Sequence, residues 1–111
     1  MTEDPAYRAT TLGEAYAQID RLPVTVLLDN IRSLHNVGAF FRTADAVRVE
    51  RMLLAGMTPT PDDGRIAKTA LGAERSLAWT KVADVASVMD ELRARGHEIA
   101  AIETSLHAVD I

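Results

Sequence analysis

The strongest constraint on the fold of this chain is an apolar segment that runs into a polar turn and then into an amphipathic segment. Residues 24–28 are short, apolar and rich in β-branched side chains, which is typical of a strand buried on both faces. After the turn, Asn36 is a good N-cap residue, so a helix is predicted to start there. Apolar residues then recur at helical spacing and predict one buried stripe: Val37, Phe40, Phe41, Ala44 and Val47. Open α/β proteins place their chemistry where strands end and helices begin.

The rest of the chain continues this alternation of strand and helix patterns. Further strands are predicted over the ranges 51–55, 77–82 and 99–102. Helices are predicted over 10–20, over 65–71 with Gly72 closing it, and from an Asp84 cap to Gly96. Right-handed crossovers between such elements give an α/β fold with a mostly parallel sheet and helices on both faces.

Length and composition restrict the class of protein. At 111 residues the chain is expected to form one domain over 23–111, preceded by a tail and short helix over 1–22. Without cysteine it has neither disulfides nor thiolate metal sites, and its histidines show no metal-ligand spacing. The apolar runs are too short to cross a bilayer, and the acidic N-terminus does not resemble a signal peptide. We therefore expect a cytoplasmic protein with no metal site and no membrane partner.

Positive charge is concentrated in the middle of the chain. The net charge is −4, which by itself argues against a nucleic-acid partner. Residues 31–81, however, carry eight lysines or arginines and five acidic residues, whereas both flanking segments are net acidic. Local potential steers a polyanion, so the central segment remains a candidate for RNA contact. Solvated surface charge is the alternative interpretation.

Two stretches resemble a known enzyme family. The pattern Asn36-x-Gly38-x-x-x-Arg42-Thr43-Ala44 follows a strand and the turn 29–31, and it resembles the first motif of the SpoU family. Residues 65–74 and the layout of residues 92–104 also resemble that family. Its members are RNA ribose 2′-O-methyltransferases of the SPOUT superfamily, which have a knotted α/β fold. The resemblance implies a homodimer that methylates tRNA or rRNA with S-adenosylmethionine as the methyl donor.

The family has two further motifs, a Gly-x-Glu turn and a Ser-Leu-Asn segment, which together form the knot that binds the cofactor. In the layout of the family both motifs follow the region that this chain resembles, so we expect neither of them within residues 1–111. The resemblance therefore implies a SPOUT-type fold without its C-terminal knot segment, and cofactor-binding residues after Ile111. We expect the 111 residues to be inactive alone.

Arg42 is the first candidate for a catalytic role. The resemblance assigns to this position the arginine that positions the ribose hydroxyl or its neighbouring phosphate and stabilises developing negative charge. The resemblance also implies that Asn36 shapes the catalytic turn. Considered alone, Arg42 is an exposed helix residue that could pair with Asp45, and Asn36 is only a cap. Gly38 permits close approach of the backbone to a ligand or a tight helix start, or else it packs against the sheet, and the sequence does not separate these possibilities.

Candidate RNA contacts are the basic residues around the same turn, because phosphate contacts dominate nucleic-acid affinity. They are Arg32, His35, Arg65, Lys68 and Arg75. For each of them an ordinary solvated side chain is the alternative, and His35 in particular could be a plain loop histidine.

Two other functions remain open. The chain could be a non-enzymatic remnant of the fold that binds RNA or a protein. It could also be an unrelated flavodoxin-like or nucleotide-binding domain, although no glycine-rich phosphate loop follows residue 28.

Overall fold

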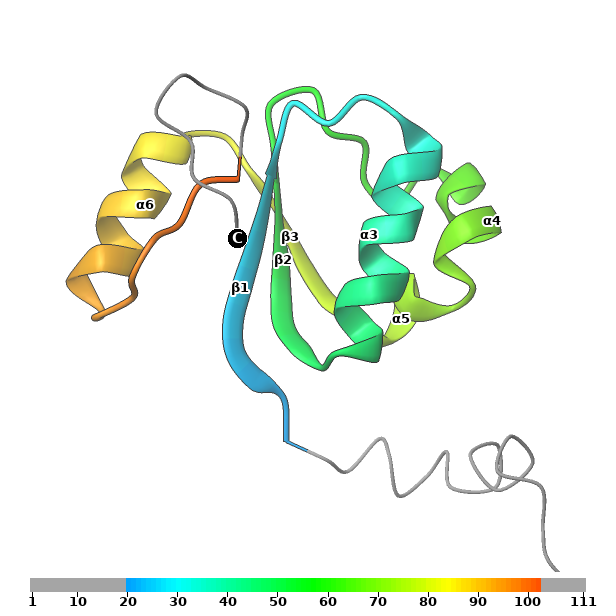
Figure 1. Cartoon of the computed structure of the whole chain (residues 1–111). Coiled ribbons are helices and arrows are strands. Elements are labelled where there is room, and N and C mark those ends of the chain that lie inside the picture. Colours follow the sequence, from blue (N-terminus) through cyan, green and yellow to red (C-terminus); the bar gives the residue numbers. More distant parts are fainter. Residues whose placement is uncertain (1–19, 103–111) are drawn as a thin grey trace, which may run out of the picture.

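The computed structural model describes residues 20–102 and shows a three-stranded parallel sheet with helices on both faces (Figure 1). The strands β1 (Leu22–Asp29), β2 (Val49–Ala55) and β3 (Ala78–Val82) lie side by side in chain order. Both strand pairs are parallel. The predicted α/β class and parallel sheet are therefore confirmed.

The central strand is β2, and it is the most buried of the three. Its residue Leu54 lies opposite Leu28 of β1 and Lys81 of β3, and residues 52–55 are all buried. A strand with neighbours on both sides and helices above and below must be apolar throughout, as 52–55 are.

Only the carboxyl end of β1 is buried, so the prediction that 24–28 is enclosed on both faces is wrong for its first part. Within the described residues, β1 is an edge strand that pairs with β2 alone. Leu22 and Val24 are half-exposed, whereas Leu28 is buried beneath the helices. Apolar, β-branched composition alone does not distinguish a central strand from an edge strand.

Four helical segments cover one face of the sheet, and one helix covers the other (Figure 1). The first group comprises α3 (Leu34–Ala46), the 3₁₀ turn η1 (Gly64–Ile66), α4 (Ala67–Ala70) and α5 (Ala73–Ser76). The opposite face carries α6 (Val85–Ala94), whose Leu92 is buried against Leu53 and Val82. The main core therefore lies between β2 and α3.

The N-cap of α3 lies three residues earlier than predicted. It is Ser33, whose hydroxyl accepts a hydrogen bond from the Asn36 backbone N–H at 3.1 Å. Ser33 is as good a cap as Asn36, and its extended backbone (φ −75°, ψ 118°) meets the geometric requirement. Val37, Phe41 and Ala44 face the core as predicted.

Phe40 and Val47 do not belong to the buried stripe of α3. Phe40 is 44% exposed, although its neighbour Phe41 is fully buried. The buried residues of α3 are Val37, Gly38, Phe41 and Ala44, so the stripe is centred away from Phe40. Val47 lies beyond the last turn as the C-cap and is also exposed.

At the C-terminal end, one prediction is confirmed and another is wrong. Asp84 caps α6, and its carboxylate accepts a hydrogen bond from the Ser87 backbone N–H at 3.2 Å. This hydrogen bond lowers the pKa of Asp84. Residues 99–102 form no strand: they pair with neither edge of the described sheet and are exposed. Four small apolar residues do not make a strand without a backbone partner. The predicted helix over 10–20 lies almost entirely outside the described residues.

The loops at the carboxyl ends of the strands are joined by side-chain hydrogen bonds. The buried hydroxyl of Thr58 donates to the Leu28 carbonyl and accepts from the Ile31 N–H, both at 3.1 Å. Asn30 accepts from the Met57 N–H at 2.9 Å. These bonds fix the chain between β1 and α3.

Lys81 of β3 joins the same cluster. Its ammonium group donates to the Gly56 and Thr58 carbonyls at 2.8 and 2.9 Å. All three strand ends are therefore connected through the loop after β2.

The contact between α3 and α4 depends on Gly38. A Cβ atom there would collide with the Thr69 hydroxyl and lie 2.7 Å from the Ile66 carbonyl oxygen. Thr69 also donates to the His35 carbonyl at 3.0 Å. The structure thus accounts for Gly38 by helix–helix packing, and the partner is α4, not the sheet.

Within the described part of the chain, no helix is long and apolar enough to span a membrane.

Replacing Thr58 by valine should destabilise the domain by roughly 1–3 kcal/mol, because the isosteric side chain removes a partner from a part-buried N–H group. Urea denaturation followed by circular dichroism measures the loss. The matched control is Thr80→Val on an exposed position of β3, which should change the unfolding free energy little. Equal effects at the two positions would contradict the role given to Thr58.

Replacing Gly38 by alanine should destabilise the domain by roughly 1–3 kcal/mol, because the added methyl group meets backbone atoms of η1 and α4. The control is Gly64→Ala, where an added Cβ has no atom within 4 Å. Thermal unfolding of both variants gives the comparison. A Gly38→Ala protein as stable as Gly64→Ala would show that α4 is not held against α3.

Candidate functional site

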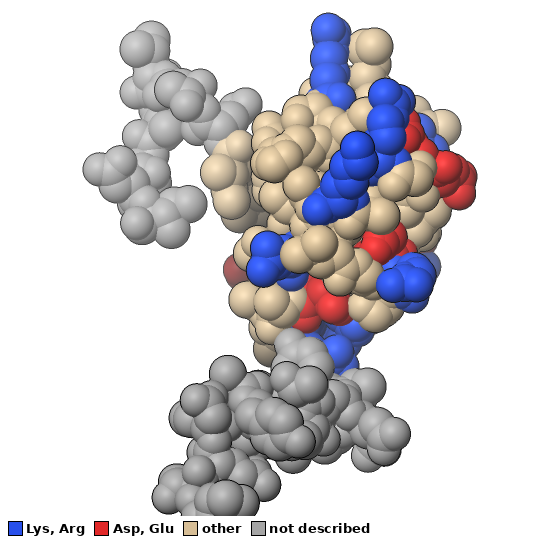
Figure 2. Space-filling model, turned by 90° about the vertical axis from the view of Figure 1, so that its right-hand side faces the viewer, with Lys and Arg blue, Asp and Glu red and all other residues tan. Residues whose placement is uncertain are grey.

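A groove lies between α3 and α4 on the outer side of this helical layer. Its volume is about 470 Å³, which is the size range of small-ligand sites. Its lining residues are His35, Ala39, Arg42, Thr43, Ala46, Val47, Lys68, Thr69 and Leu71. Figure 2 views the molecule from the side on which these helices lie, and several lysine and arginine side chains project from it.

The groove brings together three of the residues singled out in the sequence. His35 comes from the first turn of α3, Arg42 from two turns further on, and Lys68 from α4. All three are exposed, so their polar groups can reach a ligand. No carboxylate lines the groove. This arrangement suits an anion such as a phosphate group, which arginine and lysine bind by charge-assisted hydrogen bonds.

The acidic residue closest in sequence to Arg42 is engaged elsewhere. Asp45 accepts from the Arg21 guanidinium at 2.9 Å and from the Ser76 hydroxyl at 3.0 Å. The alternative in which Arg42 pairs with Asp45 is therefore not what the structure shows. Among residues 20–102, neither Arg42 nor Lys68 forms an ion pair. Their charges are available to the groove.

Arg65 is in a different situation. Its guanidinium donates to both carboxylate oxygens of Asp63, at 3.0 and 2.7 Å. These hydrogen bonds from Arg65 lower the pKa of the Asp63 carboxyl from 3.8 to about 2. Arg65 does not line the groove. Because Asp63 already balances its charge, we expect Arg65 to bind a phosphate more weakly than Lys68 does.

The remaining predicted residues are exposed but lie outside the groove lining. Arg32 is in the turn before α3, Asn36 is in the first turn of α3, and Arg75 is in α5. The structure thus brings His35, Arg42 and Lys68 together in the groove. The other predicted residues, Arg32, Asn36, Arg65 and Arg75, lie outside its lining.

Six of the nine groove residues were not predicted as site residues: Ala39, Thr43, Ala46, Val47, Thr69 and Leu71. Thr43 and Thr69 add hydroxyl groups, and Leu71 adds a large apolar side chain that is 63% exposed. Thr43 had a usable signal, since it lies beside Arg42 within the motif. Thr69 and Leu71 lie in the stretch 65–74 that resembles the family, but their position beside α3 depends on the close packing at Gly38.

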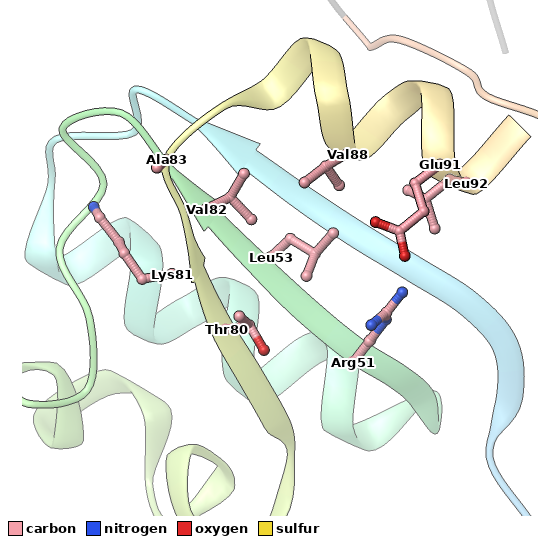
Figure 3. A pocket seen from close by; sticks show the side chains of 9 residues that line it. All are labelled: Arg51, Leu53, Thr80, Lys81, Val82, Ala83, Val88, Glu91 and Leu92. Atoms are coloured by element: carbon pink, nitrogen blue, oxygen red, sulfur yellow. The ribbon is translucent and has the colours of Figure 1, made fainter.

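A second, smaller hollow of about 260 Å³ lies on the other face of the sheet, between α6 and strands β2 and β3 (Figure 3). Figure 3 shows Arg51 and Glu91 pointing into it from opposite sides. Glu91 pairs with Arg95 at 2.6 Å. None of the predicted site residues lines this hollow, and its mixed charges favour no single ligand class. In the described part of the chain, no cluster of His, Asp or Glu is arranged to hold a metal ion.

Relatives found by comparison with known proteins are named as RNA methyltransferases. A protein from Staphylococcus haemolyticus named as a TrmH-family tRNA/rRNA methyltransferase is 30% identical over 82 residues, covering 74% of this chain and 33% of its own length. The 23S rRNA (guanosine-2′-O-)-methyltransferase RlmB of Pseudomonas aeruginosa is 28% identical over 85 residues, covering 77% and 34%. The chain thus spans about a third of the length of these relatives.

Solved structures agree with the sequence relatives. The SpoU methyltransferase AviRb from Streptomyces viridochromogenes, in complex with AdoMet, superposes with a TM-score of 0.60 at 27% identity, covering 74% of this chain and 31% of AviRb. An AdoMet-bound rRNA methyltransferase from Sinorhizobium meliloti gives a TM-score of 0.59 at 25% identity, covering 71% and 31%.

The sequence model of the SpoU rRNA Methylase family matches residues 23–111. This range contains the groove, the motif with Arg42 and all of the sheet except Leu22. The chain belongs to the SpoU methylase family.

Proposed function

We propose that this chain supplies the RNA-binding part of a ribose 2′-O-methyltransferase that acts on tRNA or rRNA. The observation that carries the proposal is the groove in which Arg42, Lys68 and His35 converge without an opposing carboxylate. The names of the relatives support the RNA substrate, and the Pseudomonas aeruginosa relative supports the 2′-O position.

Arg42 has the chemistry that such a reaction needs from the RNA side. A ribose 2′-hydroxyl is a weak nucleophile, and its oxygen gains negative charge as its proton is lost to solvent ahead of the attack on a methyl group. A guanidinium stabilises that charge and also holds an adjacent phosphate bidentately, which orients the hydroxyl. Lys68 and His35 contribute further phosphate contacts from the same groove. Arg32 and Asn36, at the start of α3, are proposed to contact the RNA where it leaves the groove.

The methyl donor in this proposal is S-adenosylmethionine, but the described residues do not fit it. The donor carries a sulfonium cation, and the α3–α4 groove presents arginine and lysine with no carboxylate. The hollow beside α6 has one carboxylate, Glu91, which already pairs with Arg95. We therefore place the donor site outside residues 20–102.

We also propose that the whole protein is a cytoplasmic homodimer.

The same misfit supports the second candidate, a non-enzymatic remnant of the fold that binds RNA or a protein. The two candidates differ in methyl transfer once a donor site is present. Both candidate functions predict that the chain alone transfers no methyl group.

Joining this chain to the part of the Pseudomonas aeruginosa relative that follows the matched segment should restore methyl transfer to RNA. In a chimaera that binds S-adenosylmethionine by calorimetry, Arg42→Ala should lower the rate by about 100-fold or more, because charge stabilisation at the reacting oxygen is lost. Transfer of a labelled methyl group to bulk tRNA and rRNA measures it.

The matched control is Arg95→Ala, which removes an exposed arginine from the opposite side of the molecule. It should leave the rate unchanged. Unaltered turnover in Arg42→Ala would refute the role of Arg42. A chimaera that binds both RNA and S-adenosylmethionine but transfers no methyl group would favour the remnant.

Binding of a short single-stranded RNA to this chain should weaken as salt rises. The phosphate contacts of Arg42 and Lys68 alone contribute about −1.4 to the slope in a plot of log affinity against log salt. Lys68→Ala should reduce the magnitude of that slope by about 0.7, whereas Arg65→Ala should reduce it less, because Arg65 is paired with Asp63. Fluorescence anisotropy at several salt concentrations gives the slopes. A flat response, or a larger effect at Arg65 than at Lys68, contradicts the assignment.

A further inference from the structure

Leu71 has a backbone conformation that leucine rarely adopts. It ends α4 in the left-handed region, with φ 52° and ψ 45°. Helix ends commonly use glycine here, because a side chain at positive φ meets the backbone. The next residue, Gly72, has the conformation expected of glycine, with φ 93°. Glycine at position 71 would adopt the same backbone conformation without the strain that leucine has there.

Burial does not explain the leucine. Its side chain is 63% exposed and belongs to neither cluster of buried core residues. A bulky side chain that is both strained and exposed is a reason to look for a ligand.

The location of Leu71 indicates what that ligand is. Leu71 lines the α3–α4 groove together with Val47, which is also half-exposed, and with the cations Arg42 and Lys68. The groove therefore presents apolar surface and positive charge side by side. A nucleotide has the matching chemistry, because an anionic phosphate is linked to a base with an apolar face. Unstacked bases in single-stranded RNA offer that face, whereas paired bases hide it.

We propose that Leu71 contacts a nucleobase of single-stranded RNA, while Arg42 and Lys68 hold the adjacent phosphates. This inference rests on the proposed function, in which the groove receives RNA, and it adds a preference for unpaired nucleotides. The left-handed backbone holds the leucine side chain out of the helix, where it packs against the base face. Leu71 thereby acts on the affinity for the base and not on the phosphate contacts.

The test compares a short single-stranded RNA with an abasic oligomer of the same length, using fluorescence anisotropy on the full chain. The wild-type chain should bind the base-containing RNA more tightly than the abasic oligomer. Leu71→Ala and Leu71→Gly should each weaken binding of the RNA by about three- to ten-fold and leave abasic binding unchanged. Arg42→Ala should weaken both.

Stability and a matched control separate base contact from a structural role. Leu71→Gly should not lower the midpoint of thermal unfolding, because glycine relieves the positive φ. Met57→Ala removes a side chain of the same 63% exposure from outside the groove and should change neither affinity.

Three results overturn the inference. If the Leu71 variants bind both oligomers like the wild type while Arg42→Ala binds weakly, the RNA groove stands and the base contact is wrong. If the Leu71 variants lose affinity for both oligomers equally, the leucine shapes the groove and does not read a base. If the wild-type chain binds neither oligomer, the RNA-binding function fails, and this inference fails with it.

Discussion

The hydroxyl group of Thr58 joins the two loops that leave the carboxyl ends of β1 and β2. It is buried and serves both as donor to Leu28 and as acceptor from Ile31. The turn that it fixes leads directly into the Ser33 cap and α3, so the direction of α3, and with it the position of Arg42, depends on this bond. A buried hydrogen bond of this kind contributes mainly because breaking it leaves polar groups without partners.

The groove results from two features that act together. Gly38 lets α4 approach α3 so closely that no Cβ fits between them, which places Lys68 beside Arg42. The Arg21 guanidinium and Ser76 hydroxyl engage Asp45, the acidic residue on α3, so its charge does not neutralise the groove. The groove is therefore cationic although the chain as a whole is acidic. Local arrangement, not total charge, decides which ligand it suits.

Much of the fold could be predicted from sequence, because strands and long helices have strong periodic signals. Of the predicted site residues, His35, Arg42 and Lys68 line one groove, and their role stays a prediction. The three parallel strands, α3 and α6 follow from such patterns. The choice of cap did not, since serine and asparagine satisfy the same geometry and only the path of the turn selects Ser33. The exposure of Phe40, the missing strand over 99–102 and the groove position of Leu71 depend on which elements become neighbours. Local sequence does not contain that information.

The central claim is that RNA binds in the α3–α4 groove. The most direct test is an NMR titration of isotope-labelled chain with a short single-stranded RNA. The account predicts that the largest chemical-shift changes occur at His35, Arg42, Lys68 and Leu71, while signals of Arg51 and Glu91 across the sheet stay in place. Shifts confined to the α6 side, or no shifts at saturating RNA, would contradict it.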